Sequence, residues 1–144
     1  MTPAPDYEAN HIRDYEYWSV YLHESQRYLG RTYIALAREG DIDPFVETTP
    51  NEQSELLMIV SGLKTVLHDL YQPTRLNYDN LRNAWHHCHW HVVPRYDTPR
   101  IVEGVEFVDE NVGKNWPPFT PFPIPESLHA RIRSDIAEAL YEVN

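Results

Sequence analysis

The chain has 144 residues, of which 42% are apolar and 24% are charged, and its formal net charge at pH 7 is −10. These proportions exclude a disordered or membrane-embedded chain, and the length fits a single domain over residues 1–144 with a core that needs no disulfides. The acidic excess argues against nonspecific binding to nucleic acid or anionic membranes, whose phosphates attract Lys and Arg, but it leaves room for a small phosphorylated ligand in a local site.

Two strands are expected in the first forty residues. The segment YEYWSVYL (15–22) is dense in aromatic and β-branched residues, whose side chains would alternate between the faces of a sheet. A turn at Leu29 and Gly30 leads to RTYIALAR (31–38), which ends in a loop that contains Gly40. We therefore expect strands over 15–22 and 31–38.

A long helix is expected next. Thr49 can cap it, Pro50 suits the first helical position, and Glu52 completes a capping box. Apolar residues then recur at helical spacing as far as about Tyr71 and form one stripe, which predicts a helix that packs on the core. The stripe consists of Leu56, Ile59, Val60, Leu63, Val66, Leu67 and Leu70.

The second half of the chain alternates strands with irregular segments. Residues 74–81 form a short strand that runs into a turn, and further strands are expected over 88–96 and 101–108. The segment WPPFTPFPIP (116–125) has five prolines in ten residues, which excludes regular structure because proline cannot complete a backbone hydrogen-bond ladder. Pro125 then opens a final helix. Its apolar face would carry Leu128, Ile132, Ile136 and Leu140.

The sequence contains no segment typical of export or membrane insertion. No apolar run is long enough for a transmembrane span or for the core of a signal peptide, and the first ten residues carry no basic side chain. Cys88 is the single cysteine, so no internal disulfide can form. We therefore expect a cytoplasmic protein.

The segment HHCHWHVV (86–93) holds four of the eight histidines. In a strand, side chains alternate between faces, so His87, His89 and His91 would project from one side. Three imidazoles in a row are a poor choice for stability alone, because imidazole is polar and titrates near neutral pH. The row therefore indicates a chemical role.

Three uses of such a row are open on these residues alone. Two histidines on one strand face can bind zinc when a further ligand completes the site, although no carboxylate or cysteine motif nearby supplies an obvious one. A neutral imidazole can instead attack phosphorus while its neighbours orient it and stabilise the leaving group. The third reading is structural, with imidazoles bonded to backbone carbonyls.

The segment HHCHWHVVPRY (86–96) resembles the histidine triad family, whose pattern is three histidines separated by single apolar residues and followed by two more apolar residues, often with Pro-Arg-Tyr after them. Cys88 and Trp90 occupy the apolar positions here. The likeness extends more weakly to LGRTYIALAR (29–38), to the long capped helix, and to LNYDNLRN (76–83) before the row.

This resemblance implies an α+β fold with an antiparallel sheet of about five strands, one long helix and a C-terminal helix. It implies a homodimer that transfers or hydrolyses at the α-phosphate of a nucleotide, without a metal or other cofactor. His89 would attack phosphorus and form a nucleotidyl-histidine intermediate that water hydrolyses. His91 would contact the atom that bridges to the leaving group, and His87 would orient its neighbours.

The chain departs from the family pattern at two positions. A further histidine often begins the second strand and bonds into the triad, whereas Arg31 stands there in this chain. Another histidine often follows that strand, at the position of Glu39. Arg31 could face a substrate phosphate, and the alternative is an exposed arginine at the edge of a strand.

Four other residues are candidates for substrate binding. Asn77 and Asn83 precede the triad, and a neutral amide can bond to ribose or to a phosphate oxygen, although Asn also caps turns. Lys114 offers a cation for leaving phosphates, and Trp116 offers a ring for stacking, although a tryptophan beside prolines can serve packing alone. The remaining histidines are expected outside the site: His86 on the opposite face, and His11, His23, His68 and His129 at the surface.

The sequence thus predicts a nucleotide hydrolase or nucleotidyl transferase that acts on dinucleoside polyphosphates or nucleoside phosphoramidates. Two alternatives remain open at this point. One is a noncatalytic nucleotide-binding protein that keeps the triad, and the other is a zinc-dependent hydrolase that uses the histidine row.

Overall fold

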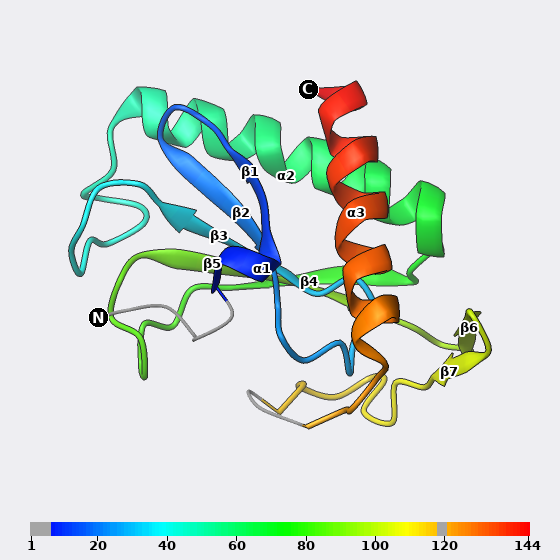
Figure 1. Ribbon diagram of the computed structural model, residues 1–144. Helices are drawn as coiled ribbons and strands as arrows, with labels where there is room; N and C mark the ends of the chain where they lie inside the picture. The colour runs from blue at the N-terminus through cyan, green and yellow to red at the C-terminus, as the bar shows by residue number, and fades with distance from the viewer. Residues whose placement is uncertain (1–6, 118–120) are drawn as a thin grey trace.

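The computed structural model of the chain describes residues 7–117 and 121–144. Within these residues, a long helix separates the third strand from the fourth (Figure 1). In chain order the elements are α1 (Tyr7–Asn10), β1 (His11–Asp14), β2 (Trp18–Leu22), β3 (Thr32–Leu36), α2 (Pro50–Tyr71), β4 (Arg75–Asp79), β5 (His89–Arg95), β6 (Arg100–Val102), β7 (Val105–Phe107) and α3 (Glu126–Val143).

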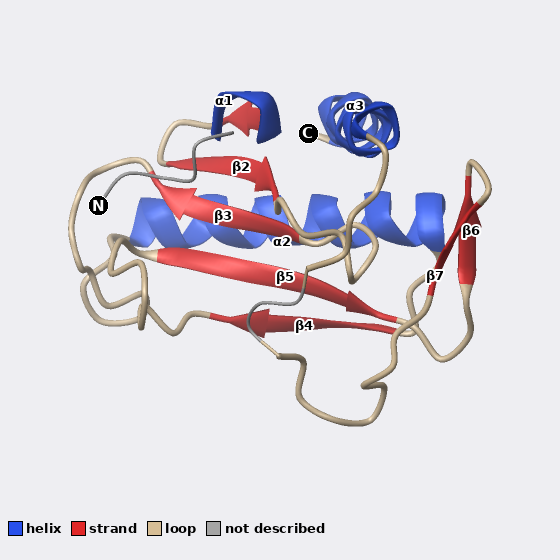
Figure 2. Ribbon diagram, turned by 60° about the horizontal axis from the view of Figure 1, so that its bottom comes forward, coloured by secondary structure: helices blue, strands red, loops and turns tan. Residues whose placement is uncertain are grey.

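Five strands form an antiparallel sheet in the order β1-β2-β3-β5-β4. The long helix α2 runs along one face of this sheet, and α3 contacts both α2 and β1 (Figure 2). This is the α+β architecture, with a five-stranded antiparallel sheet and two main helices, that the resemblance implied. No helix in the described part of the chain combines the length and the apolar character needed to cross a bilayer.

The two faces of the sheet differ in character. Alternate residues of β3 and β5, such as Ile34 and Val92, pack with α2 in the main core. Tyr33 pairs with His91 across β3 and β5, and Ala35 pairs with His89. Since directly paired residues in antiparallel strands share a face, both histidines lie on the side of the sheet away from α2. The main core also contains Trp18, Val20, Leu22, Leu36, Ile59, Leu63, Val66 and Leu67.

The start of α2 is the predicted capping box. The Thr49 side chain accepts a hydrogen bond from the Glu52 backbone N–H, and a Glu52 oxygen accepts one from the Thr49 N–H at 2.8 Å. Arg38 also binds Glu52, with Nε 2.7 Å from one carboxylate oxygen. These bonds, the one from Arg38 above all, lower the pKa of Glu52 to about 2. One carboxylate thus joins the end of β3 to the first turn of the helix.

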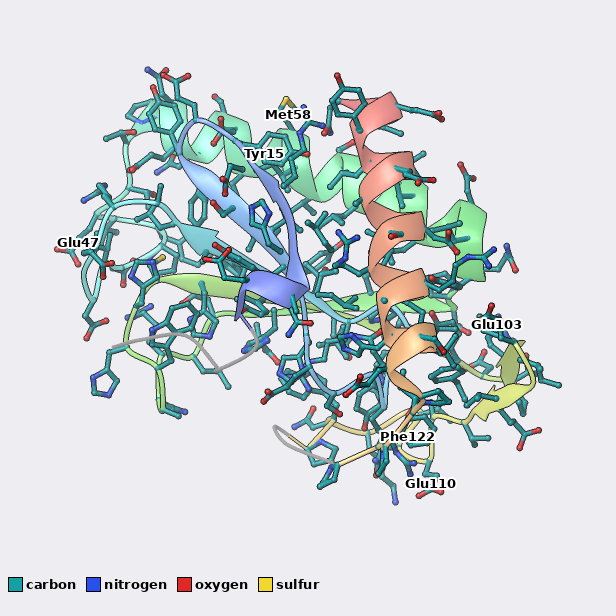
Figure 3. The ribbon with its side chains drawn as sticks, in the orientation of Figure 1. Tyr15, Glu47, Met58, Glu103, Glu110 and Phe122 are labelled. Atoms are coloured by element: carbon teal, nitrogen blue, oxygen red, sulfur yellow. The ribbon has the colours of Figure 1, made fainter. Side chains whose placement is uncertain are left out.

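The final helix packs as its spacing predicted, with Leu128, Ile132, Ile136 and Leu140 buried. Asn144, which follows the helix, joins two other elements. Its Oδ1 accepts a hydrogen bond from the Tyr15 hydroxyl at 2.6 Å, and its Nδ2 donates one to the Met58 carbonyl at 3.3 Å. Figure 3 shows Tyr15 and Met58 beside the C-terminal end of α3. This end of α3 is therefore tied to the β1–β2 turn and to α2.

The expected turn before β3 is present and requires its glycine. Gly30 has a φ of +86°, and a Cβ at this position would lie 2.8 Å from a methyl carbon of Leu67. An L-residue would therefore meet both backbone strain and a clash with α2. This close approach fixes where Arg31 enters the sheet.

Two strand predictions need correction. Residues 15–17 do not belong to the predicted 15–22 strand, because the chain turns there and the Tyr15 N–H bonds to the Trp18 carbonyl at 2.7 Å. The short polar strand β1 before this turn was missed. Residues 101–108 do not join the main sheet but form most of a separate hairpin, β6–β7. Glu103 and Gly104 at its tip have φ of 48° and 80°, which suits a tight hairpin turn.

The strand that carries the histidine row begins later than predicted, at His89. His87 lies before the strand, so simple alternation does not account for its position. The Cys88 carbonyl still accepts a hydrogen bond from the Leu36 N–H at 3.0 Å, which keeps this segment beside β3. The proline-rich segment 116–125 has no helix or strand in its described part, and its residues 118–120 lie outside the described residues.

Candidate active site

His89 is held in one tautomer by its own backbone segment. Its Nδ1 lies 2.6 Å from the His87 carbonyl oxygen. Because a carbonyl oxygen only accepts, Nδ1 carries the proton and Nε2 has a free lone pair. Burial lowers the pKa of His89 below the ordinary histidine value, and the charges of His87 and Arg82 act in the same direction. The Nε2 of a neutral His89 therefore carries an available lone pair at neutral pH.

His87 orients the strand entry through both of its ring nitrogens. Its Nε2 donates to the Leu36 carbonyl at 2.5 Å, and its Nδ1 lies 3.6 Å from an oxygen of Glu39. Glu39 is the residue that stands where the resembled family often has a histidine. The His87 ring is 9% exposed, whereas the Glu39 side chain is 89% exposed. The position of His87 is thus fixed mainly by the backbone of β3.

His91 faces a buried cation. The Nη2 of Arg31 lies 3.5 Å from its Nδ1, and the Arg31 guanidinium carbon lies 4.5 Å from the centre of the Trp116 ring. Burial, the Arg31 charge and the neighbouring His89 and His23 lower the pKa of His91 to about 2. His91 is consequently neutral across the physiological pH range.

Aromatic rings surround the three histidines of the row. Trp85 stacks on His87 at 5.1 Å between ring centres, with an angle of 19° between planes, and it lies 4.6 Å from the ring of His89. Tyr33 meets both His89 and His91 at 6.4 Å, and Trp116 meets His91 at 5.8 Å. Trp85 was not among the predicted site residues, although an aromatic residue directly before the row is a usable signal. These rings make the surroundings of His89 apolar.

His23 was wrongly expected at the surface. Its ring centre lies 5.9 Å from that of His91, and its Nδ1 accepts a hydrogen bond from the Ser25 N–H at 3.0 Å. Burial, with the Arg31 charge as the next cause, lowers the pKa of His23 to about 3. It directly follows β2, and its place beside β5 depends on the strand order, which the sequence pattern did not reveal.

Arg31 is not the exposed strand-edge arginine of the alternative reading. It is 2% exposed, and its guanidinium lies between His91 and Trp116. Burial lowers the pKa of Arg31 to about 10, which leaves it charged at neutral pH. Arg31 is thus a permanent cation inside the histidine site.

The other predicted binding residues are placed unevenly. Trp116 is buried beside His91, whereas Asn83 is exposed in the loop before Trp85. Asn77 and Lys114 instead line a surface cavity of about 620 Å³ at the far end of β4 and β5. There Arg95 binds both residues, through the Asn77 side chain at 2.9 Å and the Lys114 carbonyl at 2.8 Å. The structure therefore brings Trp116 and Arg31 to the histidines and sets Asn77 and Lys114 apart in a neighbouring cavity.

The side-chain geometry does not favour a zinc site in the histidine row. Within residues 7–117 and 121–144, no three His, Cys, Asp or Glu side chains are arranged to hold a metal ion. His87 Nε2 and His89 Nδ1 bond to carbonyl oxygens, and His91 Nδ1 faces Arg31. A metal could bind any of these three nitrogens only by displacing its present partner, which leaves His89 Nε2 as the ring nitrogen with an available lone pair.

No protein-family model and no curated protein matches the chain. Solved structures do match it. A histidine triad protein from Marinobacter aquaeolei is 18% identical with a TM-score of 0.73, and the match covers 99% of this chain and 98% of that one. A histidine triad protein from Sinorhizobium meliloti is 22% identical with a TM-score of 0.68 and 95% coverage of both chains.

A hypothetical histidine triad nucleotide-binding protein from Sulfolobus tokodaii is 17% identical with a TM-score of 0.63, and the match covers 92% of this chain and 84% of that one. At such identities, agreement over nearly the whole length of both chains establishes the architecture. The chain therefore has the fold of histidine triad proteins, and its own histidine row lies on the face of the sheet opposite α2.

Proposed function

We propose that the chain is a histidine triad nucleotide hydrolase or nucleotidyl transferase with His89 as its nucleophile. The observation that carries the proposal is the hydrogen bond between His89 Nδ1 and the His87 carbonyl, which leaves the Nε2 lone pair free for attack. The likeness in fold to a hypothetical histidine triad nucleotide-binding protein supports a nucleotide as substrate. The substrate classes that we propose are dinucleoside polyphosphates and nucleoside phosphoramidates.

In the proposed reaction, His89 Nε2 attacks the α-phosphorus and forms a P–N bond while the bond from phosphorus to the leaving group breaks. His91 then donates a hydrogen bond to the departing atom, and His87 keeps His89 in place through its carbonyl. In the second step, a water oxygen bonds to phosphorus and the P–N bond breaks. The electron pair of the P–N bond returns to His89 Nε2, a proton of the attacking water passes to solvent, and a nucleoside monophosphate leaves. No metal is required in this scheme.

The proposal also assigns roles to the flanking residues. Trp85 and Trp116 supply apolar surfaces on either side of the histidines, suited to a base or to the departing group. Lys114 and Asn77 line the neighbouring cavity, where a cation and an amide can meet distal phosphates of a long substrate. Asn83 remains a candidate ribose contact on the exposed loop.

A homodimer forms part of the proposal. Strand β4 is at the edge of the five-stranded sheet, so one side of its backbone has no strand beside it within the described residues. Tyr78 on this strand is 42% exposed. Such an edge can pair with the same strand of a second copy. Sedimentation of the purified protein would measure the oligomeric state.

The test is release of nucleoside monophosphate from a panel of diadenosine polyphosphates and adenosine phosphoramidate, with chelator present. We expect wild-type release, and we expect its loss in His89→Asn, because the amide cannot replace the nucleophilic imidazole. His68→Asn is the matched control, since His68 is exposed on α2. Binding of adenosine monophosphate by both variants, measured by calorimetry, separates loss of chemistry from loss of the site.

Two outcomes would replace the proposal. Folded wild-type protein that binds nucleotide but releases no product would favour a noncatalytic nucleotide-binding protein. The feature that suggests this alternative is the presence of Arg31 and Glu39 where the family often has histidines. Release that chelator abolishes and zinc restores would favour the metal-dependent reading.

A further inference from the structure

Arg31 lies in the site but takes part in no step of the proposed reaction. A buried arginine needs compensation, and contacts of this one include the Trp116 ring at 4.5 Å and His91 Nδ1 at 3.5 Å, both in the site. Gly30 sets its backbone position by a close approach to α2. The guanidinium is therefore held against the third histidine of the row.

The chemistry of guanidinium decides the state of His91. Arginine has N–H donors and no acceptor, so His91 Nδ1 must accept the hydrogen bond and the ring proton lies on Nε2. A second proton would have to go to Nδ1, against a permanent positive charge at hydrogen-bond distance. The burial of both groups strengthens this repulsion, because little water lies between them.

The other groups around His91 do not reverse this effect. His23 faces it from the end of β2, His89 from its own strand, and Tyr33 from β3. Across the sheet, Asp79 of β4 pairs with His91, and its carboxylate acts on the Arg31 charge. The net result of burial and these neighbours is that the pKa of His91 is lowered to about 2.

We infer that Arg31 is a positioning residue that keeps His91 neutral with its proton on Nε2, and that it thereby restricts the reaction to nucleotides whose leaving group departs as an anion. The preferred class is phosphoanhydrides such as dinucleoside polyphosphates, and phosphoramidates are disfavoured. This inference rests on the proposed function and narrows its substrate.

The two classes of substrate differ in whether the leaving group needs a proton. In a phosphoanhydride, the P–O bond breaks and its electron pair stays on the bridging oxygen of a phosphate anion, which needs no proton. A hydrogen bond from neutral His91 is sufficient to stabilise that charge. In a phosphoramidate, the P–N bond breaks and nitrogen must receive a proton to leave as an amine. Only a protonated His91 could give that proton and return to a neutral imidazole.

The kinetic test compares kcat for a diadenosine polyphosphate and for adenosine phosphoramidate in wild type, Arg31→Gln and Arg31→Lys. We expect wild type to prefer the anhydride by about 100-fold or more, the typical contribution of a general acid. Arg31→Gln, which removes the charge but keeps an amide donor, should reduce that preference at least about tenfold. It should also make phosphoramidate cleavage rise as pH falls from about 8 to about 6.5, above the range in which His89 itself is protonated. Arg31→Lys, which keeps the charge, should retain the wild-type preference.

Nitrogen-15 NMR of the labelled histidine rings gives a readout that needs no turnover, and a His91→Gln spectrum assigns the signal. We expect His91 in wild type to stay neutral, with the proton on Nε2, down to about pH 5, and to titrate at higher pH in Arg31→Gln. Equal wild-type rates on the two substrates, or a His91 that titrates near pH 6.5 in wild type, would overturn the inference. If wild type releases no product from either substrate while the NMR result holds, the proposed function fails and the Arg31–His91 relationship stands.

Discussion

Arg31 and Glu39 flank β3, and each faces a different histidine of the row. Arg31 Nη2 lies 3.5 Å from His91 Nδ1, and Glu39 Oε2 lies 3.6 Å from His87 Nδ1. These are the two positions at which the chain departs from the pattern of the family that it resembles. A buried cation therefore stands at one end of the row and an exposed carboxylate at the other. The difference in burial makes their expected contributions unequal.

Replacement of Glu39 should have little effect. Its side chain is 89% exposed, so solvent and salt screen its attraction for His87. We expect Glu39→Gln to change kcat by less than about fivefold, in line with the small energy of exposed ion pairs. Steady-state kinetics at low and physiological salt would check this. A larger fall in kcat would mean that the position of His87 depends on Glu39 and not on the Leu36 carbonyl.

We expect kcat to fall in acid only below the ordinary pKa of histidine. Protonation of His89 removes the lone pair that attacks phosphorus, so kcat falls as pH drops through the pKa of this group. Burial lowers that pKa. We expect kcat on a diadenosine polyphosphate to stay constant through about pH 6.5, the ordinary histidine value, and to fall only below it. A profile of kcat against pH gives the midpoint, and a midpoint above 6.5 would contradict a buried, neutral nucleophile.

The aromatic ring of Trp85 should contribute to kcat/KM. It stacks on His87 at 5.1 Å and lies 4.6 Å from the ring of His89. We expect Trp85→Ala to lower kcat/KM by about threefold to tenfold, because an aromatic pair contributes about 0.5–1.5 kcal/mol beyond its buried area. Trp85→Phe should recover most of the loss. If the two variants behave alike, the ring is not what supports the nucleophile.

Glu52 should make stability depend on pH in acid. Its pKa is about 2 in the folded chain, mainly because of Arg38, and about 4.3 when unfolded. The carboxylate therefore stabilises the fold above about pH 4.3, and this contribution is lost as pH falls towards 2. Urea unfolding of Glu52→Gln, which keeps a capping side chain, should show a smaller loss of stability between pH 5 and about 2.5 than wild type. Glu142→Gln on the exposed side of α3 should leave the wild-type dependence intact.

The ion pair between Arg95 and Asp109 should contribute strongly to the stability of the fold. Arg95 Nε lies 2.7 Å from Asp109 Oδ2, and both side chains are almost fully buried. We expect Asp109→Ala to lower the free energy of unfolding by about 3–5 kcal/mol, because it leaves a buried charge without its partner. The neighbouring Glu110→Gln, which removes an exposed partner of Arg27, should cost about 1 kcal/mol or less. Equal costs in urea unfolding would contradict this difference.

The sequence predicted the features that local pattern controls. The capping box of Thr49 and Glu52, the apolar face of α3 and the turn at Gly30 all depend on residues close together in the chain. The histidine row was visible for the same reason. β1 was missed because it has only four residues, of which Ile12 alone is apolar, and its pairing with β2 comes from the turn between them. The β6–β7 hairpin was taken for one strand because Glu103 and Gly104 were not recognised as its turn.

The parts of the site that come from distant segments could not be predicted in this way. His23 and Trp116 lie near His91 only because of the strand order and the path of the chain after β7. Arg31 was singled out from the sequence, but its burial and its contact with His91 depend on the pairing of β3 with β5. Such contacts follow from topology, and residue spacing carries little information about them.

The attacking group and the residue that we infer to select the leaving group belong to different strands. His89 is on β5, whereas Arg31 lies in the turn into β3 and contacts His91. A substitution at residue 31 can therefore alter which bond is cleaved without altering the hydrogen bond that prepares His89. During divergence of such proteins, or in deliberate redesign, this separation offers a route to a new substrate in a single mutational step that leaves the nucleophile intact.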